Sequence, residues 1–394
     1  MVTQQTAVVA VSRGPGGPPA RGVPWRRIPV FLTALAALLA ALWGGLLLLG
    51  LPVPAITGTT ASQHGPLMAL GFLGTVISLE RAVALARPWG FLAPASAGVG
   101  GIAVLAGQPL AGRLLLTAAS VLLVVVYVVV HRVQPALHLK VMAAGAACWY
   151  VAGVLWLADW PVARLVPWLV GFLVLTILGE RLELARVGLL RPGSGRVLTA
   201  VCAAFVVGAT LATAAAVRDL GLPPTTGVRL AGAAMIGLAV WGAVHDVARR
   251  TVRVAGVTRF MAVCLLAGYA WLAVAGAVWV AVGDLGASIG VYDAALHAVF
   301  LGFVMSMIFG HAPVIVPAVL RVRPPFRRWF YAHLGLLHVA LVVRVVGGDA
   351  LGSTALWRVG GVGTEVAVVA FLAASAAAVA GARRRARTQE GRTA

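Results

Sequence analysis

The chain has 394 residues, of which 61% are hydrophobic and only 11% are charged. Soluble domains are about 45–50% apolar, so this composition excludes a soluble globular protein and indicates an all-α polytopic membrane protein. The formal net charge of +20 would suit a nucleic-acid partner. However, the basic residues are distributed along the whole chain instead of forming one patch, which argues against nucleic acid.

Two basic tails flank the apolar part of the chain. Residues 1–27 are polar and rich in Gly, Pro and Arg, which predicts a disordered cytoplasmic tail, and residues 383–394 form a second basic cytoplasmic tail. Between them, residues 28–382 are predicted to form one twelve-helix membrane domain. The first apolar run is too long for the core of a cleaved signal peptide, so we interpret it as the first span.

The apolar runs predict twelve transmembrane helices, because a bilayer span needs about 20 apolar residues. In chain order they are 28–50, 64–86, 91–108, 112–131, 137–157, 165–182, 197–217, 228–246, 258–282, 290–317, 330–347 and 360–381. Cys148, Cys202 and Cys264 each lie within an apolar run and form no CxxC pair. Buried thiols are therefore favoured over a disulfide or a zinc site.

The basic residues orient these helices. If the N-terminus is cytoplasmic, 25 of the 31 basic residues fall on the cytoplasmic side. The outer side keeps six of them: Arg113, Arg164, Arg218, Arg229, Arg344 and Arg358. This asymmetry follows the positive-inside rule and predicts a multi-pass protein of the cell membrane with both termini in the cytoplasm. It also indicates membrane lipids as partners and requires no nucleic acid, while protein partners stay unidentified.

Spans 2, 6 and 10 share a sequence pattern. GFLGTVISLER in span 2 aligns without gaps with GFLVLTILGER in span 6, and GFVMSMIFGHAP in span 10 follows the same pattern with His311 in place of the glutamate. A similar helix at every fourth position predicts three blocks of four helices, a pseudo-threefold 4+4+4 arrangement. A six-plus-six transporter repeat would instead relate spans 2 and 8. Chance recurrence of Gly, Phe and Leu in apolar helices is the alternative.

Ionisable residues inside membrane spans are costly and are candidates for functional sites. An interfacial role is the simpler interpretation for the three histidines at cytoplasmic helix ends, which are His131, His138 and His245. The Glu80–Arg81 and Glu180–Arg181 pairs are interpreted as structural ion pairs at the inner ends of spans 2 and 6.

Two further groups of polar residues occupy the last two spans. Glu365 in span 12 is expected to pair with Arg358 or with Arg344. His333 and His338 are five residues apart on span 11, which places them about 140° apart around a helix. One ion therefore cannot readily bind both.

His64 and His297 form the most informative pair. His64 opens span 2, seven residues before Gly71, and His297 lies in span 10, five residues before the aligned Gly302. With about 1.5 Å per residue, the two imidazoles lie ~10 and ~7 Å outward of these glycines, at similar depth in the outer half of the membrane. Two imidazoles that face each other from neighbouring helices are what a bis-histidine haem site requires. Because the two side chains point in different directions relative to the glycines, a facing geometry needs differently rotated helices.

His311 is the third candidate cofactor-binding residue. It lies ~21 Å inward of His297 and about 40° around an α-helix, so one metal cannot bind both. It would serve a second site or a structural role. Hydrogen-bonded packing histidines are the alternative interpretation of all three residues.

These features resemble a known family. Twelve spans, three four-helix blocks and histidines in spans 2 and 10 resemble subunit I of the haem-copper oxidases, and HGPLMALGF and HAVFLGFVMSMIFGH more narrowly resemble the NnrS family of haem- and copper-associated membrane proteins linked to nitric oxide stress. The resemblance implies haem b as a cofactor, with His64 and His297 as its metal ligands and His311 as a second ligand or site. Spans 6 and 7 contain no histidine for an oxidase copper site, and Ser62 stands where the NnrS motif has its first histidine. Oxygen reduction at a binuclear centre is therefore not expected.

The sequence thus favours an integral membrane protein that binds haem b and has an auxiliary redox or nitric oxide-related role, without an identified catalytic residue. A secondary transporter or permease without haem is the alternative, in which Pro313 and Pro317 would break span 10. A membrane assembly factor that docks a partner subunit within the bilayer is the third possibility.

Overall fold

The computed structural model describes residues 27–185, 192–217, 223–320 and 326–393. Within these ranges the chain forms helices and no strand, and twelve helical spans are long and apolar enough to cross a membrane. The predicted all-α polytopic membrane fold is therefore confirmed. Except for Arg27, the predicted N-terminal tail lies outside the described residues.

The first six spans have the following elements. They are α1 (Ile28–Leu48); α2 (His64–Pro66), η2 (Leu67–Gly74) and α3 (Thr75–Leu85); η3 (Pro88–Phe91) and α4 (Leu92–Leu105); α5 (Pro109–Val133); α6 (Leu137–Leu157); and α7 (Val162–Ala185).

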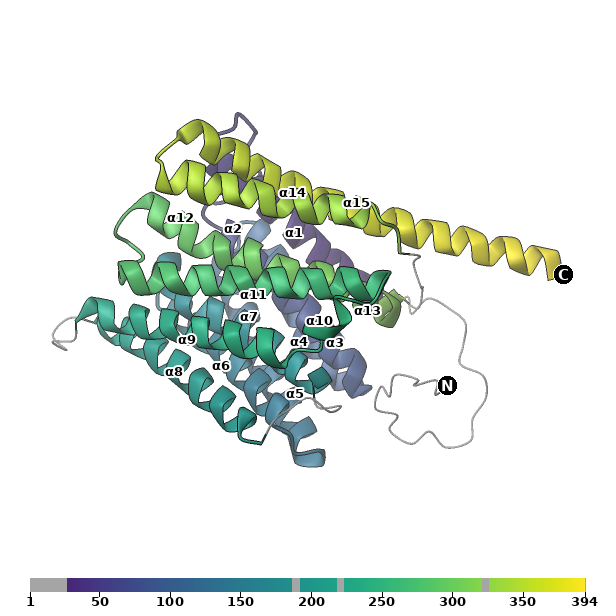
Figure 1. The fold of residues 1–394 in the computed structure, drawn as a ribbon, viewed down its shortest axis with the longest axis horizontal. Coiled ribbons are helices and arrows are strands. Elements are labelled where there is room, and N and C mark those ends of the chain that lie inside the picture. The colour runs from purple at the N-terminus through teal and green to yellow at the C-terminus, as the bar shows by residue number, and fades with distance from the viewer. Residues whose placement is uncertain (1–26, 186–191, 218–222, 321–325, 394) are drawn as a thin grey trace.

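The last six spans continue the series. They are α8 (Ser194–Ala214); α9 (Pro224–His245), followed by the short α10 (Ala248–Thr251); α11 (Val257–Val282); α12 (Ile289–His297), η4 (Ala298–Met305) and α13 (Ser306–Leu320); α14 (Phe330–Val342) and η5 (Val343–Ala350); and α15 (Thr354–Thr393). All twelve predicted spans are found. The last is longer than predicted, because α15 continues through most of the basic residues at the C-terminal end (Figure 1).

Local sequence explains where several helices begin and end. Pro29 and Pro109 lie in the first turns of α1 and α5, where a missing N–H costs nothing. Gly50 and Gly283 follow α1 and α11 with φ of 71°, a left-handed conformation that glycine adopts without strain. These residues end each span where the chain must turn back.

The packing of the helices repeats three times along the chain. In each block of four spans, the first span packs on the second and the third: α1 on η2 and α4, α6 on α7 and α8, and α11 on η4 and α14. The third and fourth spans pair as α4–α5, α8–α9 and α14–α15. Contacts between α5 and α6, α9 and α11, and α15 and α1 join the blocks into a closed ring. This repeated packing agrees with the pseudo-threefold 4+4+4 arrangement that the sequence pattern predicts.

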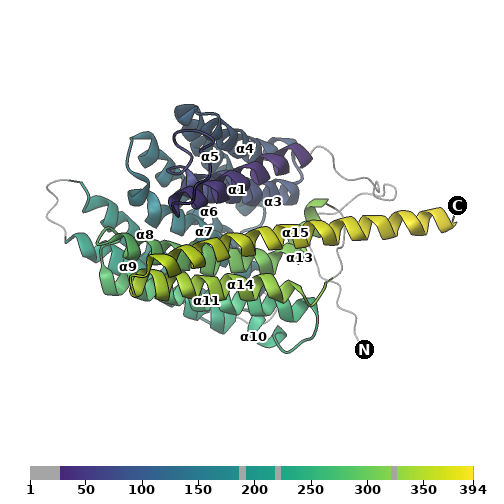
Figure 2. The ribbon, with the colours of Figure 1, turned by 90° about the horizontal axis from the view of Figure 1, so that it is seen from above.

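Spans 2, 6 and 10 occupy the centre of the ring. In the apolar stretch of α7, 83% is buried inside the protein, which is the largest share among the twelve spans. The tenth span follows with 61%. In addition, α7 contacts η4, and α3 contacts α13. Figures 1 and 2 show these helices inside the bundle, with α15 projecting beyond it. The spans that share the sequence pattern are therefore the ones that meet each other.

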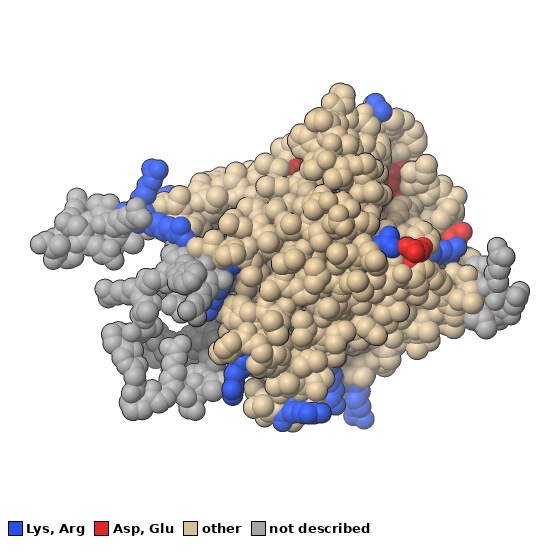
Figure 3. All heavy atoms as spheres, turned by 180° about the vertical axis from the view of Figure 1, so that it is seen from behind, with Lys and Arg blue, Asp and Glu red and all other residues tan. Residues whose placement is uncertain are grey.

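Charge is distributed unequally between the two ends of the bundle. On the face that Figure 3 shows, most basic side chains lie toward the end at which α1 begins and α15 projects, which we call the basic end, and the visible acidic side chains lie toward the opposite end. On this face, few charged side chains lie between the two ends, as expected for a surface that faces lipid (Figure 3). Cys148, Cys202 and Cys264 are buried and unbridged, as predicted.

Candidate functional site

Spans 2 and 10 each contain a π-helical segment of eight residues, η2 and η4. When Gly71 is aligned with Gly302, as the sequence pattern requires, the two segments coincide residue for residue. π-Helical segments within α-helices occur frequently at functional sites. The shared irregularity shows that the two spans are equivalent in backbone conformation as well as in sequence.

The same hydrogen bond follows each π segment. Thr75 donates its hydroxyl to the Gly71 carbonyl at 2.6 Å, and Ser306 donates to the Gly302 carbonyl at 2.6 Å. A hydroxyl bonded to the carbonyl four residues earlier locally perturbs a helix. The matching pair stabilises the same distortion in both central spans.

The π segments change the predicted placement of the three candidate histidines. The heights and angles predicted for His64, His297 and His311 assumed α-helical geometry, but a π segment has i→i+5 hydrogen bonds and therefore more residues per turn. The interval from His64 to Gly71 includes part of η2, and the interval from His297 to Gly302 includes part of η4. The two predicted depths therefore change in the same direction and can still be compared. The interval between His297 and His311 contains the whole of η4, so the angle of about 40° derived for an α-helix does not apply.

His64 packs against the first span. Its Nδ1 lies 2.6 Å from the Ala41 carbonyl oxygen, and because a carbonyl only accepts, Nδ1 carries the proton. Nε2 therefore keeps its lone pair. Gly45 permits this close approach, since a Cβ there would lie 3.2 Å from Cε1 of His64 and would overlap the Glu365 carboxylate. His64 and Glu365 thus meet at one glycine of α1.

His297 is held in a similar way. Its Nδ1 lies 2.9 Å from the Asp293 carbonyl oxygen and 3.2 Å from Oδ1 of the same residue. The Asp293 carboxylate also accepts two hydrogen bonds from Arg344 in η5, each of 2.7 Å. Nε2 of His297 has no hydrogen-bond partner within the described ranges. Both imidazoles therefore present an unused ring nitrogen.

The structure brings the two predicted ligands into one cluster. His64 lies within electrostatic range of His297, Arg344 and Asp293, although these residues come from spans 2, 10 and 11. We call this group the histidine cluster, and its members are His64, Asp293, His297, Arg344, Asp349 and Glu365. That His64 and His297 bind iron stays a prediction.

Two acidic groups of the histidine cluster lack partners. Asp349 interacts with Asp293, but its Oδ2 atom is buried without a hydrogen bond, and so is Oε2 of Glu365. The predicted ion pair of Glu365 with Arg358 or Arg344 is wrong: no such pair forms, and Arg358 instead donates to a carbonyl of α1 at 3.1 Å. Asp293, Asp349 and Glu365 thus all lie within electrostatic range of Arg344, and the last two each keep an oxygen without a partner.

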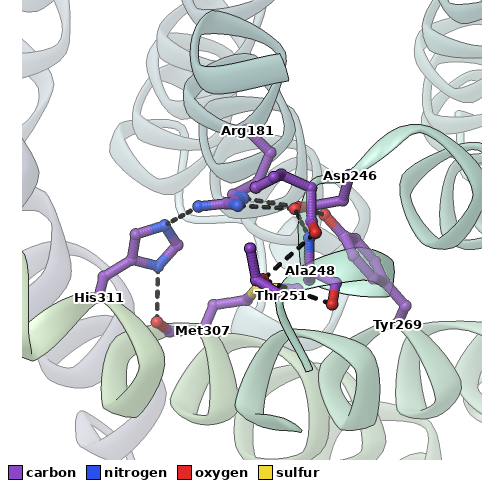
Figure 4. Close-up of polar contacts among 8 residues, drawn as sticks. Arg181, Asp246, Ala248, Thr251, Tyr269, Met307 and His311 are labelled. Carbon is purple, nitrogen blue, oxygen red and sulfur yellow. Dashed lines mark hydrogen bonds and ion pairs between the residues drawn. The ribbon is translucent and has the colours of Figure 1, made fainter. Parts of the chain in front are cut away.

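A second polar cluster lies near the basic end of the central helices (Figure 4). Arg181 donates from Nε to Asp246 at 2.6 Å and from a terminal nitrogen at 2.7 Å. The same carboxylate accepts from the Tyr269 hydroxyl at 2.7 Å and from the Ala248 backbone N–H at 2.9 Å. Asp246 reaches these donors because it ends α9 and precedes the short α10. We call this group, together with His311, the arginine network.

The pairing determines the acidity of Asp246. Burial raises the pKa of its carboxyl group, but the hydrogen bonds and charge of Arg181 outweigh that effect. The net result is a pKa below the ordinary value of an aspartate. The Asp246 carboxylate is therefore stabilised in its charged form by its partners.

His311 belongs to the arginine network and not to the histidine cluster. Its Nδ1 lies 2.6 Å from the Met307 carbonyl oxygen, and its Nε2 lies 3.3 Å from a terminal nitrogen of Arg181. Because an arginine only donates, Nε2 accepts that bond. Neither nitrogen is left for a cofactor, so the arrangement does not favour the predicted role of His311 as a ligand.

The predicted Glu80–Arg81 ion pair of span 2 forms, but in span 6 Glu180 pairs with Arg81, because Arg181 is held by Asp246. Arg81 lies 2.9 Å from Glu80, 3.4 Å from Glu180 and 3.7 Å from Glu183. His138 is buried nearby, with its Nε2 atom 3.9 Å from Glu183. The polar positions of the sequence pattern therefore connect the central spans to each other and to their neighbours.

The donor sets limit which metals the chain could bind. Within the described part of the chain, no group of three or more His, Cys, Asp or Glu side chains is arranged to hold a metal ion. A haem iron needs only two axial nitrogens, because the porphyrin supplies the other four ligands. His64 and His297 each keep one unused ring nitrogen and belong to the same cluster.

Residues 27–380 match the family model described as a domain of unknown function, DUF8744. The chain belongs to this family. The match begins one residue before α1 and ends within α15, so the matched region includes all or part of each of the twelve spans and both polar clusters. No curated protein matches the chain.

Two members of the histidine cluster, Asp293 and Asp349, are not among the residues that the sequence singles out, and Arg344 is considered there only as an outer-side arginine and as a partner of Glu365. Asp293 and Arg344 nevertheless fall inside the predicted spans 290–317 and 330–347. Two opposite charges within neighbouring predicted spans were the available signal, because buried charges occur in pairs. Their position beside His64 could not be inferred, since it depends on how distant spans pack.

Proposed function

We propose that this protein is an integral membrane haem protein in which His64 and His297 are the axial ligands of haem b. One observation carries the proposal: each imidazole is fixed at Nδ1 by a backbone carbonyl and presents a free Nε2 within the same cluster. Metal-binding histidines usually donate their other ring N–H to a carbonyl or carboxylate, which fixes both tautomer and ring orientation.

Two further features support this proposal. The histidines lie beside equivalent π segments in two central spans, as expected for a site built at the centre of a repeat. The motifs around them also resemble those of the NnrS family. By that resemblance the role is an auxiliary redox or nitric oxide-related one.

The residues of the chain have distinct tasks in this proposal. Ala41 and Asp293 orient the two imidazoles through their backbone carbonyl groups. Arg344 provides the positive charge that pairs with the Asp293 carboxylate. Bound haem would supply a one-electron redox centre. Oδ2 of Asp349 and Oε2 of Glu365 have no partner and can each hold a proton beside that centre.

The proposed orientation places the basic end in the cytoplasm of a cell whose plasma membrane contains the protein. The concentration of Arg around the basic end supports it, because positively charged loops are retained in the cytoplasm. Both termini would then be cytoplasmic. A cysteine-accessibility assay on intact cells, with single cysteines introduced near Asp159 and near Arg250, tests this orientation: only the Asp159 side should react with an impermeant thiol reagent.

A reduced-minus-oxidised absorption spectrum of the purified protein, expressed with ample haem, tests haem binding. We expect the bands of a six-coordinate haem b in the wild type, and their loss in His64→Ala and in His297→Ala. His311→Ala is the matched control and should keep them, because His311 uses both nitrogens within the protein. A wild-type spectrum without haem bands, or unchanged bands in both ligand variants, would refute the assignment.

A proton-coupled transporter is the second candidate function. The unpartnered carboxylates of Asp349 and Glu365 favour it, because acidic groups inside spans commonly mark proton pathways. Proteoliposomes test it through proton uptake driven by an imposed potential. Uptake that Asp349→Asn abolishes, in a protein without haem bands, would support the transporter over the haem protein.

A further inference from the structure

A pocket separate from both polar clusters lies between α11, α13, α14 and α15. Five phenylalanines line it, and its empty volume is about 460 Å³, including the part that opens to the surroundings. Pockets for small molecules are mostly apolar with a few polar groups. The lining of this pocket has that composition.

His333 is the unusual residue of this pocket. It is only 4% exposed, and both of its ring nitrogens are buried without a hydrogen bond. Phe309 and Phe371 meet its ring edge-to-face, with ring centres 4.9 and 5.4 Å away. Buried polar groups almost always have a partner, and among the described residues His333 is the histidine of which both ring nitrogens lack one.

The chemistry of the lining restricts the partner. Among the described residues that line the pocket there is no lysine, arginine or acid, so a phosphate or a cation would find no counter-charge among them. A neutral imidazole offers one N–H donor and one acceptor nitrogen. Aromatic rings pack well against other flat rings. A flat, apolar molecule with a carbonyl or hydroxyl group at its edge satisfies all three conditions.

The pocket lies where such a molecule could enter it from the membrane. The pocket lies near the first turns of α11 and α14, which begin at the basic end. Val314, which follows the lining residue Pro313, is 56% exposed on the apolar surface. This side of the pocket therefore borders the lipid region in which apolar ring compounds dissolve.

We propose that this pocket binds the ring of a membrane quinone, with His333 as the hydrogen-bond partner of a ring carbonyl. Ser375 also lines the pocket and makes no hydrogen bond among the described residues, so its hydroxyl can donate to the same ring. The inference concerns binding alone and assigns no electron transfer. It does not depend on haem, because none of its residues belongs to the histidine cluster.

Two matched probes test the proposal. The affinity of the purified protein for 2-methyl-1,4-naphthoquinone and for 2-methylnaphthalene, measured by equilibrium dialysis in detergent, separates hydrogen bonding from apolar partitioning. We expect the wild type to prefer the quinone by about tenfold, the effect of one buried hydrogen bond. Equal affinity for the two probes, or no binding of either, as when water occupies the pocket, would overturn the proposal.

Three variants locate the site. His333→Phe keeps an aromatic ring but removes both nitrogens, so the preference for the quinone should fall to near unity while naphthalene binding is retained. Ala312→Phe fills the pocket and should weaken both probes. His131→Ala, at a distant helix end, is the control and should bind as the wild type does. If His333→Phe and Ala312→Phe both retain wild-type quinone affinity, the probe binds elsewhere and the proposal is wrong.

Discussion

The two polar clusters contain the same ion pair in different surroundings. Arg181 meets Asp246 through Nε and a terminal nitrogen at 2.6 and 2.7 Å, and Arg344 meets Asp293 through the same two atoms at 2.7 Å each. In the arginine network, the carboxylate has two further donors and the charges balance. In the histidine cluster, two more carboxylates lie close by, and each has an unpartnered oxygen.

This difference distinguishes a polar cluster that stabilises the fold from one that is available to bind a ligand. A buried ion pair whose hydrogen bonds are all satisfied holds helices together, and breaking it leaves an uncompensated charge. A cluster with surplus acids and free imidazole nitrogens costs stability unless a ligand or a proton completes it. We therefore assign the arginine network to the fold and the histidine cluster to function.

The largest effect should come from breaking the arginine network. Asp246→Asn leaves the Arg181 charge unpaired in a site where both side chains are at most 4% exposed, and should lower the free energy of unfolding by about 3–5 kcal/mol. Denaturant titration in mixed micelles measures it. The double variant Arg181→Leu/Asp246→Leu should lose less than the single one. A single variant as stable as the wild type would contradict the structural role.

The equivalent change in the histidine cluster should cost less. Asp293→Asn removes the main partner of Arg344, but Asp349 lies beside it and can accept from the same guanidinium. We expect a loss of about 1–3 kcal/mol, the range for hydrogen bonds to a charged group. The same titration compares the two asparagine variants directly. A larger loss for Asp293→Asn than for Asp246→Asn would reverse the comparison.

Low pH should remove the stability that Asp246 contributes to the arginine network. Because the pKa of Asp246 is lower in the folded protein than in the unfolded chain, its contribution is fully present above the unfolded value of about 3.9 and is lost as the pH falls through the folded value. The difference in melting temperature between wild type and Asp246→Asn should thus stay constant from pH 7 to about 4 and narrow only below that. A gap that closes near pH 6 would contradict the lowered pKa. Asp159→Asn, at an exposed aspartate, is the control.

A smaller effect should come from the hydroxyls that follow the π segments. Thr75→Val and Ser306→Ala each remove one hydrogen bond to a helix carbonyl, which is worth about 0.5–1.5 kcal/mol. If η2 and η4 are equivalent elements of the repeat, the two losses should agree within experimental error in thermal unfolding. Clearly unequal losses would argue against that equivalence.

The smallest effect on stability should come from the unpartnered acids. Asp349→Asn and Glu365→Gln replace a carboxyl group of which one oxygen has no partner, so the melting temperature should stay the same or rise slightly. If these groups exchange protons with a redox centre, the pH dependence of its midpoint potential should weaken in both variants. A loss of stability as large as that of Asp246→Asn would show that they are structural.

The sequence predicted more of the fold than of the site. Span number, approximate boundaries and the Glu80–Arg81 ion pair follow from hydrophobicity and from the repeated pattern, whereas the pairing of Glu180 with Arg81 in place of Arg181 does not. The surroundings of Glu365 and the hydrogen-bond partner of His311 could not be predicted from the sequence. Both are set by helix rotation, and a π segment changes that rotation without an evident sequence signal.

By itself, then, the sequence determined the membrane class, the twelve spans and the threefold repeat, because apolar length and repeated patterns are local properties of the chain. Only the tertiary structure decided that His64 and His297 share one cluster with surplus acids while His311 joins Arg181. The physical reason is that a side chain's neighbours across a bundle depend on how spans far apart in the chain are rotated and packed, and the pairing of buried charges is settled there.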